Sequence, residues 1–538
     1  MNAFAEKHIV AIDLGTSKMS LTVTKVCGND IQIVYYKEAP SAGIKYSGVV
    51  NILHAYAPLT HLIQEAEEAL SIKINQAVIG MPKFPVRQES NSGMVPDRGE
   101  DTEITAEDIA NLKKFAQETY PLEDPKKEAI YGAVAQSFSD GEYFQIIEND
   151  IIGMTSDVLE GHFKIFIGKK KDLKNADNLL SRAGITSKKK YFTAETTAKA
   201  VLTDIEMENG VALVDFGGGS TSVTIYHGNI MRHYASIPFG GRSITNDIKS
   251  ELQISERLAE NIKLAFGACM PDRLQSLSEK VLHITGNPAE QAKEVTLKYL
   301  SEIITARVEE IIQAILYEIS ESGLAEHLRG GIVVTGGCAE MANLGILIKQ
   351  MSGYNVRTGY PLNTWSSQGI EGISATSAAT AIGLVQAALE EESMNCAVYE
   401  ERFHTELEAV EIVPAPAAIE TAEKEVVRES AVVEEPVVEV EPVAVPEVNV
   451  PEVAATVVTV PEVAVPEVKA PAAAPETPAA VQEEEDEDYD PELEDDDDEN
   501  AFGKNGIGHK FMIFWGKAKR KIEKVGDRTD AMIDNISE

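Results

Sequence analysis

A short segment near the start of the chain places an acid, a glycine, two hydroxyls and a lysine between two apolar runs. In chain order, these residues are Asp13, Gly15, Thr16, Ser17 and Lys18. A glycine turn lets backbone N–H groups approach a phosphate closely, the hydroxyls and the lysine add donors, and the acid can orient a magnesium-bound water. The pattern indicates phosphate binding, although an Asp-x-Gly turn in a hairpin is more often purely structural.

A second segment repeats this design far along the chain. It contains Asp215, Gly217, Gly218, Gly219 and Ser220, and it again lies between two apolar runs. Three consecutive glycines cost conformational entropy, so a turn that is only structural rarely needs them. Two hairpins of one design could face each other across a cleft and hold a phosphate tail from both sides.

A third glycine turn follows the apolar run 332–334. Gly336 and Gly337 leave a stretch of backbone that is bare of side chains, against which a flat purine or a ribose could rest. We expect this turn to close a strand and to open a helix.

These turns need strands and helices to hold them in place. Up to about residue 395, short β-rich runs alternate with longer helical stretches, which is typical of an α/β protein. One helix is predicted clearly, because apolar residues from Ile303 to Leu316 recur at three- and four-residue spacing. A chain of 538 residues is too long for one core, so we expect residues 1–395 to form a folded body with more than one domain.

After residue 395 the composition changes. Twelve of the 23 prolines fall between residues 401 and 500, where Val-Pro-Glu-Val recurs four times, and 14 of the 17 residues from 483 to 499 are acidic. Proline at this density prevents helix and sheet, and the segment has too few aromatic residues to build a core. We therefore predict a disordered, acidic linker over residues 396–505.

The charge of the chain is unevenly distributed. The formal charge of −39 divides into −15 for residues 1–400, −27 for residues 401–500 and +3 for residues 501–538. An acidic body argues against nucleic-acid binding, which needs a basic surface. Four scattered cysteines without a CxxC pair exclude a zinc ribbon and a disulfide scaffold. No apolar run approaches the roughly 18 residues of a membrane-spanning helix, so we expect a cytoplasmic protein unless something else holds it to a surface.

The last part of the chain contains a segment that favours membrane binding. On a helix over residues 506–526, aromatic and aliphatic side chains share one stripe and basic side chains cover the rest, as in helices that lie in the plane of an anionic membrane. The residues expected to meet the membrane are Phe511, Phe514, Trp515, Lys517, Lys519, Arg520, Lys521 and Ile522. The alternatives are a helix docked on the body and a protein-binding helix, but a long linker suits a remote target. Residues 527–538 would form a short tail.

Taken together, the three glycine turns resemble those of the actin-like ATPase superfamily in order and spacing. Within it, residues 5 to 390 are similar to the family of the bacterial cell-division protein FtsA. The segments that carry this resemblance include 92–96, 104–109, 152–155, 158–165, 244–248 and 361–363. The resemblance implies an α/β, two-lobed actin-like fold. It also implies a family-specific inserted subdomain over residues 80–182 and a second lobe over about 215–330 that includes a partner-binding subdomain.

The resemblance also implies an ATP site. The two glycine loops would hold the phosphates, Asp13 and Asp215 would hold magnesium through water, and Gly336 and Gly337 would lie against the adenosine. Glu260 and Lys263 are three residues apart on a predicted helix and would reach the ribose and adenine. By itself this pair is equally well explained as an exposed ion pair.

Two departures from strongly hydrolytic relatives predict slow hydrolysis. Those relatives have a GGGT-x-D second loop, whereas here Ser220 replaces the threonine and Ser222 the acid, and a hydroxyl cannot supply that charge. On the first connecting helix, the position of their acid or amide aligns with Thr193, and Glu195 lies nearby. We expect ATP to act as a conformational or polymerisation ligand.

The family's role implies the partners and the location. It places the chain at the division site, on the inner face of the cytoplasmic membrane. There it would anchor the tubulin-like GTPase FtsZ by the C-terminal peptide of FtsZ, self-associate into polymers and recruit later division proteins. Arg307 would contribute a positive contact to that peptide, or would be a solvated helix arginine. The main alternative is a sugar or small-metabolite kinase of the same superfamily; a chaperone and a pilus-assembly or shape-determining relative are others.

Overall fold

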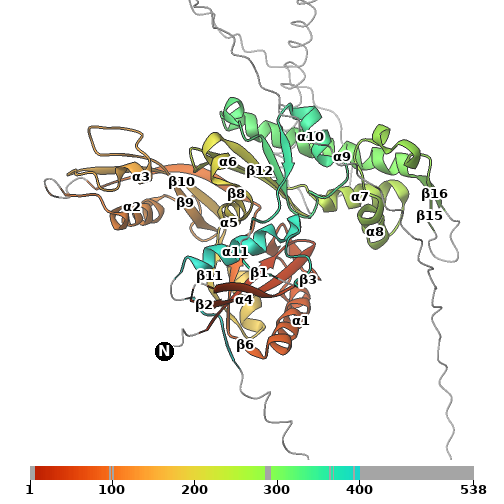
Figure 1. Ribbon diagram of the computed structural model, residues 1–538, viewed down its shortest axis with the longest axis horizontal. Helices are drawn as coiled ribbons and strands as arrows, with labels where there is room; N and C mark the ends of the chain where they lie inside the picture. Colours follow the sequence, from red (N-terminus) through yellow and green to blue (C-terminus); the bar gives the residue numbers. More distant parts are fainter. Residues whose placement is uncertain are drawn as a thin grey trace, which may run out of the picture. The chain divides into compact units, whose positions relative to one another are not determined.

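Two five-stranded sheets of one topology form the body of the protein (Figure 1). The computed structural model describes residues 6–399, except 29, 96–98, 100–101, 285–292, 363–364, 368 and 392–393. The strand order is β3-β2-β1-β7-β11 in the first sheet and β14-β13-β12-β17-β18 in the second. In each, an antiparallel meander of three strands is extended by two parallel strands. This duplication confirms the two-lobed actin-like α/β fold that the sequence predicts.

The first sheet is covered by helices. Its strands are β1 (Lys7–Leu14), β2 (Lys18–Cys27), β3 (Asp30–Pro40), β7 (Gln76–Gly80) and β11 (Thr186–Tyr191). α1 (Ile52–Leu70) packs against β2 and β3, and α11 (Ala379–Leu389) packs against β1, β2 and β7. Residues 8–12 of β1 are all buried, as expected for a strand that is covered on both faces. The short strands β4 (Ile44–Lys45) and β5 (Gly48–Val49) lead into α1.

A three-stranded antiparallel sheet is inserted between β7 and β11. It consists of β8 (Val86–Val95), β10 (Leu159–Lys169) and β9 (Glu128–Ser139) in that order, with α2 (Ala106–Thr119) and the one-turn α3 (Glu148–Ile151). Thr105 and Asp108 cap the start of α2 reciprocally, and Ile109 and Leu112 are buried in the core of the insert. α4 (Lys170–Arg182) then returns the chain to the first lobe, where it packs against α1 and β11.

The second sheet extends beyond the range predicted for its lobe. Its strands are β12 (Val211–Phe216), β13 (Thr221–His227), β14 (Ile230–Ile237), β17 (Ile332–Thr335) and β18 (Val356–Thr358). The predicted range 215–330 therefore stops too early. Parallel strands need a long crossover, so β17 joins β12 only after α9 (Leu297–Glu321), and β18 follows α10 (Leu344–Ser352).

An extension projects from the second lobe around the end of α9. It contains α7 (Gly241–Leu252), α8 (Glu256–Phe266), the 3-10 helix η1 (Pro271–Leu277) and the hairpin of β15 (Val281–Ile284) and β16 (Lys293–Thr296) (Figure 1). α9 confirms the helix predicted from the spacing of its apolar residues, and it buries Ile304, Val308 and Ile312.

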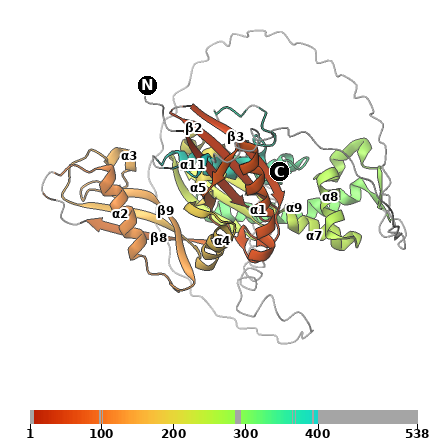
Figure 2. The same ribbon diagram turned by 90° about the horizontal axis from the view of Figure 1, so that it is seen from below.

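Two helices rich in small residues connect the lobes (Figure 2). α5 (Thr193–Val201) packs against α11, which follows the 3-10 turn η3 (Thr376–Ala378). Gly383 allows this contact, since a Cβ at this position would lie 2.2 Å from the backbone oxygen of Thr196. After α5, the chain continues through α6 (Asp204–Asn209) into β12, and the 3-10 turn η2 (Ala325–His327) precedes β17.

The folded body continues past residue 395. β19 (Ala397–Tyr399) pairs antiparallel with β6 (Ile72–Ile74), and the backbone N–H of Cys396 donates to the backbone oxygen of His8 at 2.7 Å. The predicted linker start at residue 396 is therefore too early, because residues 397–399 still form a strand that pairs with β6 of the first lobe. The remaining linker, the membrane helix over 506–526 and the tail lie outside the described residues.

Candidate functional site

The first glycine loop connects β1 to β2 as a tight hairpin. Asp13 lies opposite Ser20 in the register of the two strands, which confirms the predicted strand–turn–strand. A Cβ on Gly15 would lie 2.4 Å from the backbone oxygen of Lys18, so only glycine fits the turn. The hydroxyl of Ser41 donates to the backbone oxygen of Gly15 at 2.8 Å, and Lys18 forms an ion pair with Glu38 of β3.

The second glycine loop connects β12 to β13 in the same way. Asp215 lies opposite Ser222, and the backbone N–H of Gly217 donates to the backbone oxygen of Ser220 at 3.1 Å. The start of α7 closes over the loop, since the backbone N–H of Arg242 donates to the backbone oxygen of Gly218 at 2.7 Å. Neighbouring strands therefore fix both loops in place.

The two loops touch each other. A Cβ on Gly218 would lie 2.1 Å from the hydroxyl oxygen of Ser17, and one on Gly219 would lie 2.5 Å from the hydroxyl oxygen of Thr16. The triple glycine is thus the feature that lets the hairpins of the two lobes approach. Their backbone N–H groups and hydroxyls come from two sheets and meet at one place, as the repeated design suggested.

A mostly buried lysine lies beside these loops and interacts with the charges of both acids. Lys83 follows β7, and its ammonium group forms an ion pair with Asp215; the side chains are 12% and 7% exposed. Burial raises the pKa of Asp13, and the charge of Asp215 raises it further, while Lys83 lowers it. Burial acts to lower the pKa of Lys83, but the charges of Asp215 and Asp13 outweigh it and raise that pKa. The ionisations of Asp13, Lys83 and Asp215 are therefore coupled.

Sequence reasoning missed Lys83 and the residues that hold it. Its ammonium donates to the hydroxyl of Thr380 on α11 at 3.3 Å, and the hydroxyl of Tyr234 on β14 donates to its backbone oxygen at 2.7 Å. Strand order, and not a local sequence pattern, brings Lys83 to the site. β7 runs parallel to β1, and Ile79 pairs with Ile12, so the residues that follow β7 reach the same sheet edge as Asp13.

The third glycine turn closes β17 beside Asp215. Gly336 has a φ of 89°, and a Cβ there would lie 2.6 Å from a carboxylate oxygen of Asp215. Around Gly337, a Cβ would meet nothing within 4 Å. The sequence predicted that this turn opens a helix, but the helix does not follow directly. Asn343 adopts a left-handed conformation with φ 64°, and α10 begins only at Leu344.

Glu260 and Lys263 lie on one face of α8, as predicted, but the pair is not simply an exposed ion pair. The ammonium of Lys263 is buried and donates to Glu260 at 2.8 Å, to the hydroxyl of Thr245 at 2.9 Å and to the backbone oxygen of Gly241 at 3.0 Å. Gly241 also contacts Cys338, where a Cβ would lie 2.6 Å from the sulfur. Burial raises the pKa of the Cys338 thiol to about 11, so this thiol is neutral at physiological pH. Gly241 therefore connects α8, through Lys263, with Cys338 of the third glycine turn.

The two positions at which hydrolytic relatives carry an acid or amide hold Ser222 and Thr193 in this chain. Ser222 is buried in β13, and the hydroxyl of Thr193 donates to the backbone oxygen of Met81 at 3.3 Å. Glu195 points elsewhere, because its carboxylate lies 4.0 Å from the position of a Cβ on Gly132 in the insert. Burial raises the pKa of Glu195.

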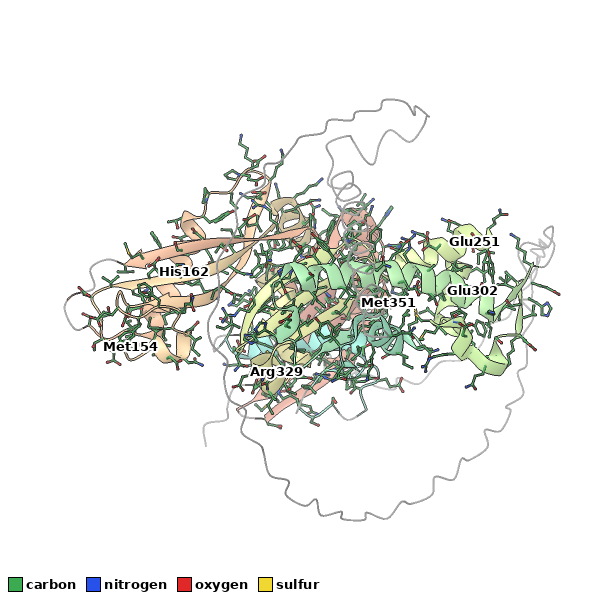
Figure 3. The ribbon with its side chains drawn as sticks, turned by 90° about the horizontal axis from the view of Figure 1, so that it is seen from above. Met154, His162, Glu251, Glu302, Arg329 and Met351 are labelled. Carbon is green, nitrogen blue, oxygen red and sulfur yellow. The ribbon has the colours of Figure 1, made fainter. Side chains whose placement is uncertain are left out.

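Arg307 lies on α9 within the extension and is held by acidic residues. Its guanidinium donates to both carboxylate oxygens of Asp247 on α7, at 2.5 and 3.0 Å, and to Glu310 at 2.6 Å. It also lies 5.8 Å from the ring centre of Phe239. Glu251 and Glu302, labelled in Figure 3, lie on the same extension. Arg307 is therefore an oriented, partly buried arginine rather than a freely solvated one.

The residues predicted to meet a membrane, from Phe511 to Ile522, lie outside the described residues. Within residues 6–399, apart from their gaps, no helix is both long enough and apolar enough to span a bilayer.

Comparison with known proteins decides the family. The family model described as cell division protein FtsA matches residues 212–383. The cell division protein FtsA of Neisseria meningitidis serogroup B is 30% identical over 385 residues, which cover 71% of this chain and 90% of that protein. The chain belongs to the FtsA family of cell division proteins. That it is a cell-division protein follows from this membership, and the actin-like fold agrees with the duplicated sheet.

Other relatives and solved structures are similar over comparable shares of the chain. The FtsA of Streptococcus pneumoniae serotype 2 is 30% identical over 66% of this chain and 76% of that protein, and the FtsA of Escherichia coli K12 is 26% identical over 68% and 86%. The PilM-PilN type IV pilus biogenesis complex matches with a TM-score of 0.47 and 13% identity, over 72% of this chain and 99% of that one. MreB5 of Spiroplasma citri bound to ADP matches with a TM-score of 0.43 and 12% identity, over 71% and 97%.

Proposed function

We propose that this chain binds ATP between its two lobes and anchors the FtsZ ring to the inner face of the cytoplasmic membrane. The observation that carries the nucleotide part is the contact of the two glycine loops beside Asp13, Lys83 and Asp215. Converging backbone N–H groups, hydroxyls and a lysine are what a polyphosphate requires. Membership of the FtsA family supports the division role.

The acids beside the loops fit magnesium. Asp13 and Asp215 offer carboxylate oxygens, which are the donors that magnesium prefers, usually through water. The ammonium group of Lys83 supplies positive charge to both acids. When bound with ATP, magnesium neutralises charge on the phosphate oxygens.

We propose that hydrolysis is slow and that the nucleotide serves as a conformational or polymerisation ligand. The support is that positions 222 and 193 hold Ser222 and Thr193, which carry no carboxylate, and that the carboxylate of Glu195 lies against Gly132 of the insert. A water aligned only by hydroxyls lacks the charged group that places it for attack. Turnover at the rates of kinases, about 1–100 per second, would contradict this part and favour the kinase alternative.

We propose that Arg307 takes part in binding the C-terminal peptide of FtsZ. A peptide carboxylate would have to compete with Asp247 and Glu310, which already bind the guanidinium. Binding of the peptide therefore requires the guanidinium of Arg307 to exchange one of these carboxylates for a carboxylate of the peptide. Salt weakens this binding, because the Arg307 side chain is 26% exposed. Self-association into polymers and recruitment of later division proteins complete the proposed role.

Gly337→Ala is expected to weaken ATP binding about tenfold without changing stability. The added methyl group would meet no protein atom within 4 Å, so any loss of affinity reports a ligand at this place. Isothermal titration with ATP and magnesium measures the affinity, and thermal unfolding measures the stability. Unchanged affinity would show that the adenosine does not lie against this turn.

The anchoring role is tested by pelleting the chain with anionic lipid vesicles and purified FtsZ. The control is a variant that ends at Asn500, and both are tested with and without ATP. We expect the intact chain to pellet and to bring FtsZ with it, whereas the shortened chain brings neither. If the intact chain stays in the supernatant, the segment 506–526 is not a membrane helix. If it pellets without FtsZ, the proposed partner is wrong.

A further inference from the structure

A two-residue turn beside the first glycine loop has a backbone conformation that its residue types seldom adopt. β4 and β5 pair as a hairpin in which Lys45 lies opposite Gly48, and Tyr46 and Ser47 form the turn between them. The φ angles of Tyr46 and Ser47 are 54° and 62°. A turn with positive φ at both central residues usually contains asparagine, aspartate or glycine, because a bulky side chain is strained there. We call Tyr46 and Ser47 the strained turn.

The second lobe contains a turn of the same geometry that is built from ordinary turn residues. Gly228 and Asn229 join β13 to β14, and their φ angles are 62° and 59°. Glycine and asparagine accept a positive φ at little cost. A tyrosine at the corresponding place in the first lobe therefore carries a conformational cost that the fold avoids elsewhere. Strained backbone persists where its surroundings fix it, and it is concentrated at functional sites.

Contacts with two distant segments hold the strained turn. The backbone N–H of Ser47 donates to the hydroxyl of Thr16 in the first glycine loop at 3.0 Å. The ring of Tyr46 packs edge-to-face against the ring of Phe84, and the ring centres lie 5.1 Å apart. The strained turn thus connects the first glycine loop with the segment that follows β7.

The segment after β7 carries the lysine of the site. Phe84 directly follows Lys83, whose ammonium interacts with the charges of Asp13 and Asp215. The backbone oxygen of Lys83 accepts a hydrogen bond from the hydroxyl of Tyr234 in the second lobe at 2.7 Å. The adjacent Phe84 packs against Tyr46 of the first lobe. The backbone that carries the lysine is therefore held from both lobes.

We propose that Tyr46 is a positioning residue for Lys83. From the strained turn, the ring of Tyr46 fixes Phe84 and thereby holds the ammonium of the preceding lysine beside the two glycine loops. A lysine side chain has many rotamers, and confining it to one position costs conformational entropy. When neighbouring groups confine the ammonium before a ligand arrives, binding of that ligand no longer has to do so. The effect on nucleotide affinity rests on the proposed function of the site.

Acetylation of lysines in the folded chain tests the position of Lys83 without any nucleotide. Acetic anhydride in limited amount reacts with amines according to their exposure, and mass spectrometry of peptides gives the rate at each lysine. The side chain of Lys83 is 12% exposed, so this amine should react slowly in the unmodified chain. We expect Tyr46→Ala to raise the rate at Lys83 about fivefold, because the segment around the lysine opens more often. Tyr46→Phe, which keeps the ring, should restore the slow rate.

Two controls separate positioning from a general loss of structure. The side chain of Lys263 in the second lobe is 8% exposed, and its acetylation rate should stay the same in Tyr46→Ala. Tyr354→Ala removes a partly buried tyrosine that precedes β18, and it should leave the rate at Lys83 unchanged. An unchanged rate at Lys83 in Tyr46→Ala would overturn the proposal. An equal increase at Lys263, or an equal increase at Lys83 in Tyr354→Ala, would overturn it as well.

Isothermal titration with ATP and magnesium tests the consequence for the site. Tyr46→Ala should weaken ATP binding about tenfold, Tyr46→Phe should restore it, and Tyr354→Ala should not affect it. Unchanged affinity in Tyr46→Ala would overturn the proposal for the nucleotide site. Weaker binding with an unchanged acetylation rate at Lys83 would mean that Tyr46 contacts the nucleotide itself, which also contradicts a positioning role. If the unmodified chain binds no ATP, the proposed function fails, whereas the acetylation rates still decide whether Tyr46 positions Lys83.

Discussion

Replacing Lys83 by methionine is expected to lower the free energy of unfolding of the nucleotide-free protein by about 3–5 kcal/mol. The ammonium of Lys83 is the buried positive partner of Asp215, and it also lowers the pKa of Asp13. Without it, two carboxylates from the two lobes are left close together in a buried place. Urea unfolding followed by circular dichroism measures the loss.

Two comparisons identify the cause of this loss. Adding Asp215→Asn to Lys83→Met should restore part of the stability, because the repulsion between the carboxylates is removed. Magnesium at millimolar concentration should stabilise the Lys83→Met variant more than the unmodified chain if Asp13 and Asp215 bind a cation. Equal destabilisation in the single and double variants, with no effect of magnesium, would show that Lys83 acts only through packing.

Replacing Gly383 by alanine is expected to destabilise the protein by about 3 kcal/mol. The added methyl group would lie 2.2 Å from the backbone oxygen of Thr196, which belongs to the helix that packs against α11. A backbone atom cannot move aside as a flexible side chain can, so α5 and α11 must separate. Thermal unfolding measures the effect.

Gly345→Ala is the matched control for this substitution. Gly345 lies in α10, and the nearest atom to an added Cβ is the Val356 Cγ1 at 3.7 Å, an ordinary contact. Alanine also favours the helix there, so this variant should unfold at or above the temperature of the unmodified chain. If Gly383→Ala unfolds at the same temperature as Gly345→Ala, α5 and α11 can move apart at little cost and their close contact does not contribute to stability.

The sequence by itself determined the features whose cause is local. Glycine and hydroxyl residues between apolar runs predicted the hairpins at Asp13–Lys18 and Asp215–Ser220, because turn chemistry depends on a few adjacent residues. The spacing of apolar residues predicted α9, because one helix face must be buried. The resemblance of the three glycine turns to an actin-like superfamily predicted the two-lobed fold, and the resemblance of segments such as 92–96, 158–165 and 244–248 predicted the family.

Tertiary structure alone decided which distant residues meet. Lys83 and Asp215 are separated by 132 positions, and Lys83 and Thr380 by 297, so no local pattern joins them. The same holds for the burial of Lys263 beneath Gly241 and for the pairing of β19 with β6. The charge of a side chain can be read from its type, but its partner and its exposure depend on the packing of the lobes. The ion pair at the centre of the site is therefore set by strand order in two sheets, which no short segment of the sequence encodes.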